Sequence, residues 1–397
     1  MTPRRSAAAA FVCVSMISGC VSIGAADPTE HRQRVRDLGI VIGGYPTGPL
    51  NAITDVPGVK VGHATIIKGE GPLKPGEGPA RTGVTVVIPR DDVWHKKVPA
   101  GSFVLNGTGE MTGLAWIAES GFLEYPVALT NTLNVPRVAN GVMSWMIKHN
   151  PEIGISDDTL TPVVAECDDS RLNDSQGRHV SEEDVIAALD GASSGPVKEG
   201  TVGAGTGMVS YGFKGGIGTA SRTVSEKEGG YTIGVLVNAN HGRRRELVVG
   251  GVPVGKLYDA PQPGAEMLSP GQSEGSIIVL IATDAPLDSR QLTRLAKRAA
   301  LGLARTGSTA RHGSGDFMLA FSTGNIIPHY PKHATFQLTH LADTHLNPLI
   351  TATVEATEEA ILNALTMATT VVGRDNHRIE SISLSRLRAI LAQPNRP

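Results

Sequence analysis

The chain has 397 residues, of which 40% are hydrophobic and 4% are aromatic, and its formal net charge is -2. Because nucleic-acid-binding proteins carry a clustered basic surface, this balance argues against that class and against a nucleic-acid partner. The 47 glycines indicate many turns and closely packed strands with aliphatic side chains. The length suffices for one large domain or two of medium size.

The first 26 residues have the composition of an export signal. Two arginines precede an apolar stretch, residues 7–16, which is too short to span a bilayer. The sequence Ile-Ser-Gly-Cys that ends at Cys20 resembles the cleavage site of bacterial lipoproteins, and the alternative is ordinary signal cleavage near Ala26. We therefore expect residues 1–26 to form a signal and tether. We also expect the mature protein to be exported to the periplasm and anchored to a bacterial membrane by a lipid on Cys20.

The first half of the chain mixes strand-like and helix-like patterns. Short runs of aliphatic or β-branched residues predict strands, and apolar residues at 3.6-residue spacing predict helices. The expected elements are strands over 53–65, 82–89, 102–105, 127–132 and 162–166, and helices over 114–121, 138–148 and 182–189.

The second half continues in the same way. The expected elements are strands over 218–224, 231–240, 276–285 and 316–322, and helices over 289–305, 354–372 and 383–392. Strands that arrive in pairs, with helices between the pairs, favour sheets covered by helices over one doubly wound sheet. Beyond the signal, Cys167 is the one remaining cysteine, so the mature domain cannot form an internal disulfide.

The aliphatic run over residues 277–282 predicts a fully buried strand. Gly275 and Ser276 lie at its start, where glycine permits a sharp bend and the close approach of another group. A serine at the start of a rigid strand is well placed to act as a nucleophile. The alternative is an ordinary Gly-Ser turn before a strand, and the local sequence leaves both open.

Four more polar side chains lie at the ends of expected strands. Ser314 and Asp316 are two residues apart, so an extended segment places both on one side, where they can share a hydrogen bond. The side-chain amide of Asn240 can donate to an oxyanion, and Glu166 ends an aliphatic strand on a carboxylate that could hold a substrate ammonium. The alternatives are a polar turn for the first pair, a β-turn asparagine, and a structural arginine or lysine beside Glu166.

Two other patterns do not support a site. Residues 191–195 match the G-x-S-x-G nucleophile elbow, but that motif needs a strand before it and a helix after it. Here a helix precedes it and Pro196 follows, so we expect a helix end and a loop. Histidines 329, 333, 340 and 345 match no standard zinc spacing, so we expect a surface loop, with no metal site and no cofactor.

Taken together, segments spread over residues 36–325 resemble the DmpA/BapA-type aminopeptidases, a family of self-cleaving hydrolases with an N-terminal serine nucleophile. The segments that carry the resemblance lie at 55–62 (Asp-Val-Pro-Gly-Val-Lys-Val-Gly), 106–113 (Asn-Gly-Thr-Gly-Glu-Met-Thr-Gly), 130–132, 172–174, 203–208, 235–240, 275–278 and 313–316 (Gly-Ser-Gly-Asp). So many segments in one order make a specific signal.

The resemblance implies an αββα sandwich, residues 27–397, that cuts itself between Gly275 and Ser276 into chains 27–275 and 276–397. It implies a serine aminopeptidase or amidase that forms an acyl-enzyme on Ser276. The expected substrates are short peptides, amides or esters with a free amine on a small L-, D- or β-amino acid. It also implies a homotetramer of cleaved protomers.

The family's site residues are carried over position by position. Ser314 and Asp316 match the assisting serine and acid, Asn240 the oxyanion-hole asparagine, and Glu166 the acid that holds the substrate amine. One position departs, because Asp168 stands where the family has an aromatic hydroxyl. A tyrosine O–H can donate to an oxyanion and an ionised aspartate cannot, so Asp168 is expected to help hold the ammonium.

Two other functions stay open. One is an acyltransferase of the same architecture, resembling the ornithine acetyltransferases, although those use threonine as nucleophile and Ser276 argues against it. The other is a catalytically silent exported binding protein that keeps the fold, which the departure at Asp168 makes worth considering.

Overall fold

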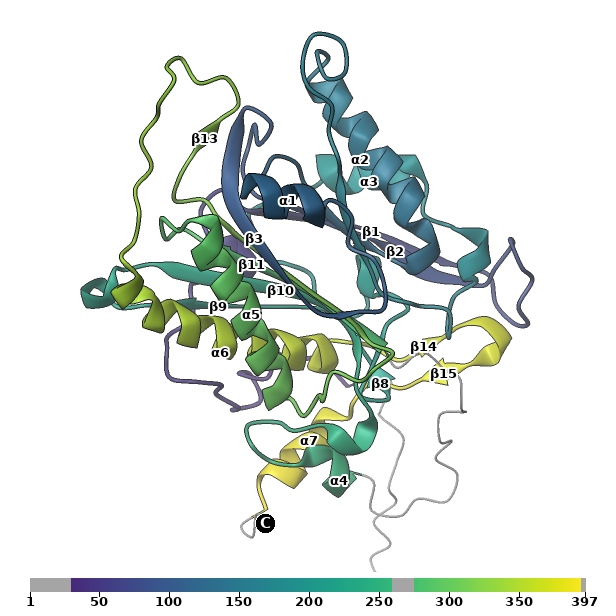
Figure 1. Ribbon diagram of the computed structural model, residues 1–397. Coiled ribbons are helices and arrows are strands. Elements are labelled where there is room, and N and C mark those ends of the chain that lie inside the picture. The colour runs from purple at the N-terminus through teal and green to yellow at the C-terminus, as the bar shows by residue number, and fades with distance from the viewer. Residues whose placement is uncertain (1–29, 259–274, 394–397) are drawn as a thin grey trace, which may run out of the picture.

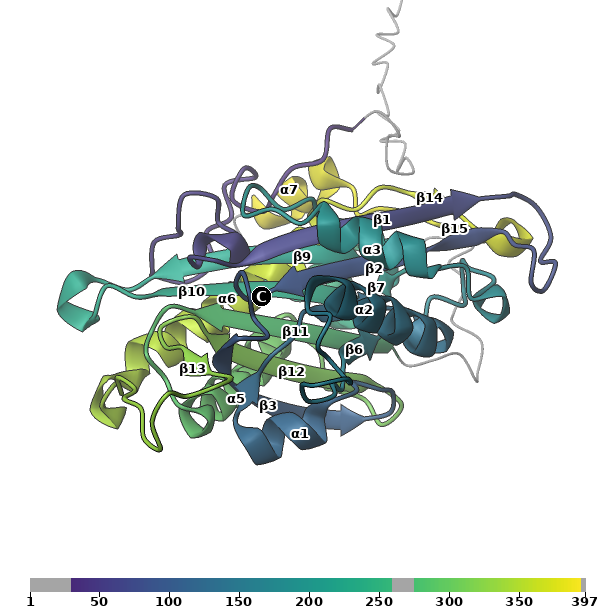
Figure 2. The same ribbon diagram turned by 90° about the horizontal axis from the view of Figure 1, so that it is seen from above.

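The structure is a computed structural model that describes residues 30–258 and 275–393. Two β-sheets pack face to face, and helices cover the outer face of each sheet (Figure 1). Seen from above, the strands of the two sheets run across the molecule in neighbouring layers (Figure 2). The four layers confirm the αββα sandwich expected from the sequence.

The smaller sheet has four strands. In spatial order they are β1 (Lys60–Lys68), β2 (Ala80–Ile88), β5 (Val127–Thr130) and β6 (Val163–Glu166). The first three pair antiparallel and β6 lies parallel to β5. Helices α2 (Val135–His149) and α3 (Glu182–Asp190) pack against its outer face. Ser181 caps α3 by accepting a hydrogen bond from the Asp184 N–H, as its place before the helix predicts.

The larger sheet has seven strands. In spatial order six of them are β13 (Ile327–Pro328), β3 (Lys96–Gly107), β12 (Gly315–Ser322), β11 (Gly275–Thr283), β10 (Thr232–His241) and β9 (Gly216–Thr223), and β4 (Phe122–Leu123) pairs with β3. Strand β11 is parallel to β12 and antiparallel to β10. Helices α5 (Ser289–Arg305) and α6 (Leu346–Thr366) cover the outer face.

Strand β11 is buried on both faces because it separates two apolar layers. Ile278 and Leu280 belong to the core between the two sheets, whereas Val279 and Ile281 belong to the core under α5 and α6. A strand with two buried faces needs a continuous aliphatic run instead of alternating polar and apolar residues. The position of Ser276, two residues before Ile278, therefore places its side chain on the face toward the smaller sheet.

Short elements complete the fold. They are α1 (Leu114–Ser120), α4 (Val254–Tyr258), α7 (Leu384–Leu391), the pair β7 (Val209–Ser210) and β8 (Phe213–Lys214), and the pair β14 (Val371–Val372) and β15 (Arg378–Ile379). Cys167 is free and buried. Among the residues that the structure describes, no helix combines the length and apolar character of a membrane span. The expected signal with Cys20 lies outside them.

Buried charges join the N-terminal part of the chain to α6. The Arg222 side chain is fully buried and pairs with Glu359 at 2.6 Å and with Glu355 at 3.2 Å. Glu359 also accepts hydrogen bonds from Arg36 at 2.8 Å and from Asn51 at 2.6 Å. Because every charge in this group has a partner, the helix can carry carboxylates in the protein interior.

Candidate active site

Ser276 is the second residue of β11 and lies between two neighbouring strands. Its register partners are Asn240 on β10 and Gly315 on β12. The side chain is buried, and its hydroxyl donates to the Gly275 carbonyl oxygen at 2.8 Å. The Gly315 N–H donates to the same hydroxyl at 3.3 Å. The hydroxyl is thus held against the peptide bond that precedes its own residue.

Gly275 has a backbone that other residues rarely adopt. Its φ of 98° lies in the left-handed region, and a Cβ built there would stand 2.3 Å from the Asn240 carbonyl oxygen. Both the dihedral and the close approach of β10 require glycine. The chain therefore reaches Ser276 by a turn that only this residue type can make.

Ser314 and Asp316 form the hydrogen-bonded pair that their spacing predicts. The Ser314 hydroxyl donates to Asp316 Oδ1 at 2.7 Å, and both residues are buried. The Asn106 amide donates to Asp316 Oδ2 at 2.9 Å. Burial raises the pKa of Asp316, and the hydrogen bonds from Ser314 and Asn106 act in the opposite direction. Each carboxylate oxygen thus has a neutral donor.

The orientation of the Asn240 amide is fixed by two backbone groups. Its Oδ1 accepts from the Val209 N–H at 2.8 Å, and its Nδ2 donates to the Asp168 carbonyl oxygen at 2.9 Å. Only one of the two Nδ2 hydrogens is used by that bond. Asn240 lies directly across from Ser276, so its second N–H is a candidate donor to a group bound at Ser276.

Glu166 ends β6 as a buried carboxylate, 3% exposed, that the chain holds from two sides. The Glu110 N–H donates to its Oε1 at 3.0 Å, and the Thr132 hydroxyl donates to Oε2. A Cβ at Gly109 would stand 2.5 Å from Oε1, so glycine is needed there. Burial raises the pKa of Glu166, although these two hydrogen bonds act against that rise.

Asp168 follows two residues later and is half-buried. Its carboxylate accepts from the Ser170 N–H at 2.8 Å and from the Ser170 hydroxyl at 2.9 Å, which fixes its direction. Its negative charge is one of the causes that raise the pKa of Glu166. The two carboxylates therefore lie close enough to interact, and together they can attract a cation.

Several contributors to this arrangement were not anticipated. They are Asn106, Gly109, Thr132 and Val209, which hold the expected residues in place. Two of them, with Glu110, lie in the segment Asn-Gly-Thr-Gly-Glu over 106–110. The sequence did contain a signal for this segment. It is polar, contains two glycines and directly follows an expected strand, and glycines permit a close approach to other groups.

The two patterns set aside in the sequence lie after α3 and after β13. Gly191 is the C-cap of α3, which confirms a helix end at residues 191–195. His333, His340 and His345 are exposed as expected, but His329 departs from the surface-loop expectation because its side chain is only 2% exposed.

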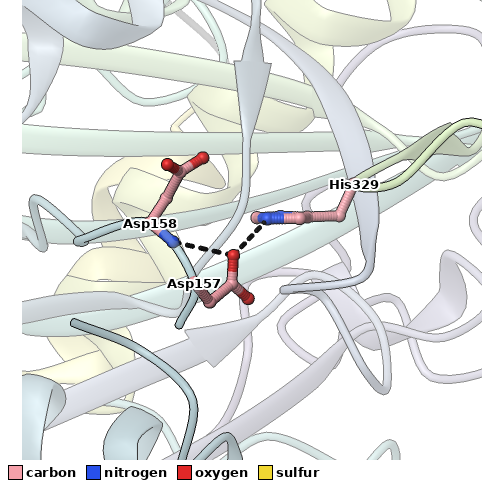
Figure 3. Close-up of side chains that lie close together, drawn as sticks. All are labelled: Asp157, Asp158 and His329. Carbon is pink, nitrogen blue, oxygen red and sulfur yellow. Dashed lines mark hydrogen bonds and ion pairs between the residues drawn. The ribbon is translucent and has the colours of Figure 1, made fainter. Parts of the chain in front are cut away.

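His329 belongs to a group with Asp157 and Asp158 whose potential ligand atoms lie within 4.8 Å of one another (Figure 3). The Asp157 carboxylate already accepts the Trp94 indole N–H at 2.8 Å and the Asp158 N–H at 2.7 Å, and His329 Nε2 is 2.9 Å from it. The Tyr330 hydroxyl donates to the same carboxylate. These hydrogen bonds link the loop of Asp157 to the segment that contains His329 and Tyr330.

The sandwich with a buried serine at the start of a central strand is the architecture of the N-terminal-nucleophile type of hydrolase. A solved structure from Ochrobactrum anthropi, described as an L-aminopeptidase D-Ala-esterase/amidase and a variant of that fold, is 44% identical and has a TM-score of 0.83 over 91% of this chain and 99% of its own. A Burkholderia β-aminopeptidase is 43% identical and has a TM-score of 0.83 over 92% of this chain and 100% of its own.

The family follows from the sequence comparison. The model of peptidase family S58 matches residues 51–379, and the chain belongs to this family. The β-peptidyl aminopeptidase BapA of Sphingosinicella xenopeptidilytica is 46% identical over 367 residues, which cover 90% of each chain. The protein is therefore a hydrolase, and aminopeptidase activity is the function that its family and its relatives support.

Proposed function

We propose that the protein cuts its own chain before Ser276 and then acts as a serine aminopeptidase through that residue. The observation that carries the proposal is the 2.8 Å contact between the Ser276 hydroxyl and the Gly275 carbonyl oxygen. The bond to be cut and the group to cut it are thus already adjacent. The proposal is supported by Asn240 on β10 as a candidate oxyanion donor, and by Asp316 on β12 with Ser314 just before that strand as a candidate proton acceptor.

The self-cleavage step uses groups that the chain itself contains. The Ser276 oxygen attacks the Gly275 carbonyl carbon, its proton passes to the amide nitrogen of Ser276, and the C–N bond breaks. The product is an ester between Gly275 and the Ser276 oxygen. Water then hydrolyses the ester, which leaves a carboxylate on Gly275 and a free amine on Ser276.

Substrate hydrolysis repeats this chemistry on an external peptide. A serine hydroxyl is a weak nucleophile and needs a base. The new α-amine of Ser276, with a pKa of about 7.7–8.0 in model compounds, is a suitable base near neutral pH. The Ser314–Asp316 pair offers a second route for the proton. Asn240 stabilises the oxyanion, the leaving amine departs, and water releases the acyl group from Ser276.

The two carboxylates near the nucleophile support substrates with a free amine. Glu166 has one donor on each oxygen and retains acceptor capacity for an ammonium. Asp168 adds negative charge beside it. We assign to this site short peptides, amides and esters that begin with a small L-, D- or β-amino acid. The names of the relatives, a β-peptidyl aminopeptidase and an L-aminopeptidase D-Ala-esterase/amidase, support this range.

Intact-mass measurement of the purified protein tests the proposal. We expect two polypeptides, one of which begins at Ser276, and hydrolysis of an alanyl p-nitroanilide. The Ser276→Ala variant should give one uncut polypeptide and no hydrolysis. An active wild-type protein that remains a single unbroken chain would exclude the proposed mechanism.

We further propose that the protein is exported, bound to a membrane through a lipid on Cys20, and assembled as a homotetramer. The support is the signal-like sequence before Cys20 and the resemblance to a family of cleaved tetramers. Labelling with radioactive palmitate in a bacterial host should mark the wild type and not Cys20→Ser. Light scattering of the protein without residues 1–26 should give four times the protomer mass, and a monomer would contradict the assembly.

A further inference from the structure

Strand β3 contains one extra residue next to the candidate active site. Its antiparallel pairing with β12 is regular from Phe321↔Ala100 to Phe317↔Val104, but the next pair is Asp316↔Asn106. Leu105 is therefore left without a partner on β12, which is the pattern of a β-bulge. A regular ladder would have placed Leu105 opposite Asp316. The bulge instead brings an amide to the carboxylate.

The Asn106 amide group is fixed by three oxygen atoms. Its Nδ2 lies 2.9 Å from Asp316 Oδ2, 2.9 Å from the Ala310 carbonyl oxygen and 3.1 Å from the Arg311 carbonyl oxygen. Because all three neighbours are acceptors, the NH₂ side of the amide must face them. Ser314 takes the other carboxylate oxygen, so the two donors together determine the plane of the Asp316 carboxylate.

Asp316 has no cation to stabilise its charge within the described part of the chain, because no ion pair of a lysine, arginine or histidine involves it. The preceding loop contributes no charge to it, because the Arg311 guanidinium pairs with Glu246. From β11 it receives the Ile277 N–H. From the smaller sheet it faces the buried Cys167 thiol, whose pKa is raised by burial and in part by Asp316. Its ionised form thus depends on neutral donors.

We propose that Asn106 is a positioning residue, placed by the bulge at Leu105, that keeps Asp316 ionised and directed at Ser314. The inference rests on the proposed function, since Asp316 matters for catalysis only if Ser314 relays the proton of Ser276. Asn106 itself touches neither the nucleophile nor the substrate. A hydrogen bond from Asn106 lowers the pKa of Asp316 against the effect of burial, so its removal should raise that pKa.

The test is the pH dependence of kcat in Asn106→Ala and Asn106→Asp. At saturating substrate Glu166 is occupied by the substrate amine, so the acid side of the profile reports the groups of the complex. The Ser276 α-amine, with a pKa of about 7.7–8.0 in model compounds, sets the first acid limb, and Asp316 sets a second limb at lower pH. In Asn106→Ala the second limb should move up by about one pH unit, as expected for one lost hydrogen bond to a charged group. In Asn106→Asp it should move further, because two adjacent carboxylates share a proton. KM should change little in either variant.

Asn325→Ala is the matched control, since the amide side chain of this half-buried asparagine bonds to the Thr339 backbone across a loop. It should keep the wild-type profile. A uniform fall of kcat at every pH in Asn106→Ala, or an unshifted second acid limb, would overturn the inference in favour of a purely structural role.

A second measurement does not depend on activity. In the Ser276→Ala background, ¹³C NMR of the Asp316 carboxyl should show a higher pKa when Asn106 is alanine. An equal pKa in both proteins rejects the inference even if the wild type proves inactive. An inactive, uncut wild type together with a raised Asp316 pKa rejects the proposed function and retains the effect of Asn106 on Asp316.

Discussion

Asn240 and Ser276 lie directly opposite each other on the adjacent antiparallel strands β10 and β11. Side chains of such a pair leave the sheet on the same face, with Cβ atoms about 4.5–5.5 Å apart. The relation between the candidate nucleophile and the candidate oxyanion donor is therefore set by strand register. Loop conformation has little influence on it.

Asn240→Ala should lower kcat by about two to three orders of magnitude, the usual loss for one oxyanion-hole donor. KM should change much less, because the bond forms fully only as the oxyanion develops. Steady-state kinetics on a p-nitroanilide substrate measure both. Asn240→Asp keeps the size and removes the donor, so a fully active Asn240→Asp would contradict the assignment.

Gly275→Ala should block or strongly slow self-cleavage. A Cβ at this position meets the Asn240 carbonyl oxygen at 2.3 Å and requires an unfavourable positive φ. A denaturing gel of freshly purified protein measures the cut fraction. Gly39→Ala is the matched control, because Gly39 also has a positive φ of 81° but no atom within 4 Å of the added Cβ. If Gly275→Ala is cut as fast as Gly39→Ala, the turn before Ser276 has no role.

The KM for substrates with a free amine should rise as the pH falls through the raised pKa of Glu166. Above that pKa the carboxylate is ionised and binds the ammonium, and below it the neutral acid does not. Glu166→Gln should raise KM at neutral pH and flatten this dependence. Initial rates measured between pH 4 and 8 would show this pH dependence of KM. A steep rise of KM with falling pH that persists in Glu166→Gln would exclude Glu166 as the cause.

Arg222→Met should reduce the free energy of unfolding by about 3–5 kcal/mol, because it leaves buried carboxylates without their partner. Urea unfolding followed by circular dichroism measures the change. Arg290→Met is the control, since its ion pair with Asp343 at 2.8 Å is on the surface, where such pairs contribute little.

The same ion pairs determine how stability depends on acid. Burial would raise the pKa of Glu359, but the hydrogen bond from Arg36 and the charge of Arg222 outweigh it and lower that pKa below its usual value. The stabilisation from Glu359 is therefore complete above its unfolded pKa and is lost as the pH falls through its folded pKa. The difference in unfolding free energy between the wild type and Arg222→Met should therefore shrink as the pH falls through that range. Unfolding curves at a series of acid pH values measure this difference, and a constant difference would contradict the assignment.

Helix α5 could be predicted to the residue and α6 could not. The 289–305 prediction is confirmed because Asp288 caps the helix and its apolar residues follow a 3.6-residue spacing. Helix α6 was expected over 354–372 but spans Leu346–Thr366. Pro348 lies in the first turn of α6, where a missing N–H is tolerated. Val371 and Val372 form strand β14 instead of helix.

Strands were found where expected, but their extents depend on partners. Strand β3 was expected over 102–105 and spans Lys96–Gly107, because pairing with β13, β4 and β12 overrides the weak strand preference of its lysines, Pro99 and Gly101. Residues 53–65 were expected to be extended, whereas Ile53–Asp55 form a 3-10 turn before β1.

The residues of the candidate site also fall into two groups, those that the local sequence reveals and those that only the fold reveals. Ser276, Asn240 and Asp316 lie at strand ends that local pattern reveals, and the structure brings them together. Asn106 reaches Asp316 only because a bulge shifts the register, and Thr132 reaches Glu166 from a turn after another strand. Neither contact can be derived from spacing along the chain. The catalytic roles themselves stay predictions.

The strand order of the larger sheet determines whether the two fragments stay associated after the proposed cut. Strands β11 and β12, downstream of the proposed cut, lie between β3 and β10, which are upstream of it. Neither fragment can leave without tearing open the sheet, so the halves should stay associated after processing. Once melted, however, they would have to find each other by diffusion. Recovery of the folded protomer after heating should then improve with protein concentration, whereas folding of the uncut Ser276→Ala chain into its protomer should not depend on dilution.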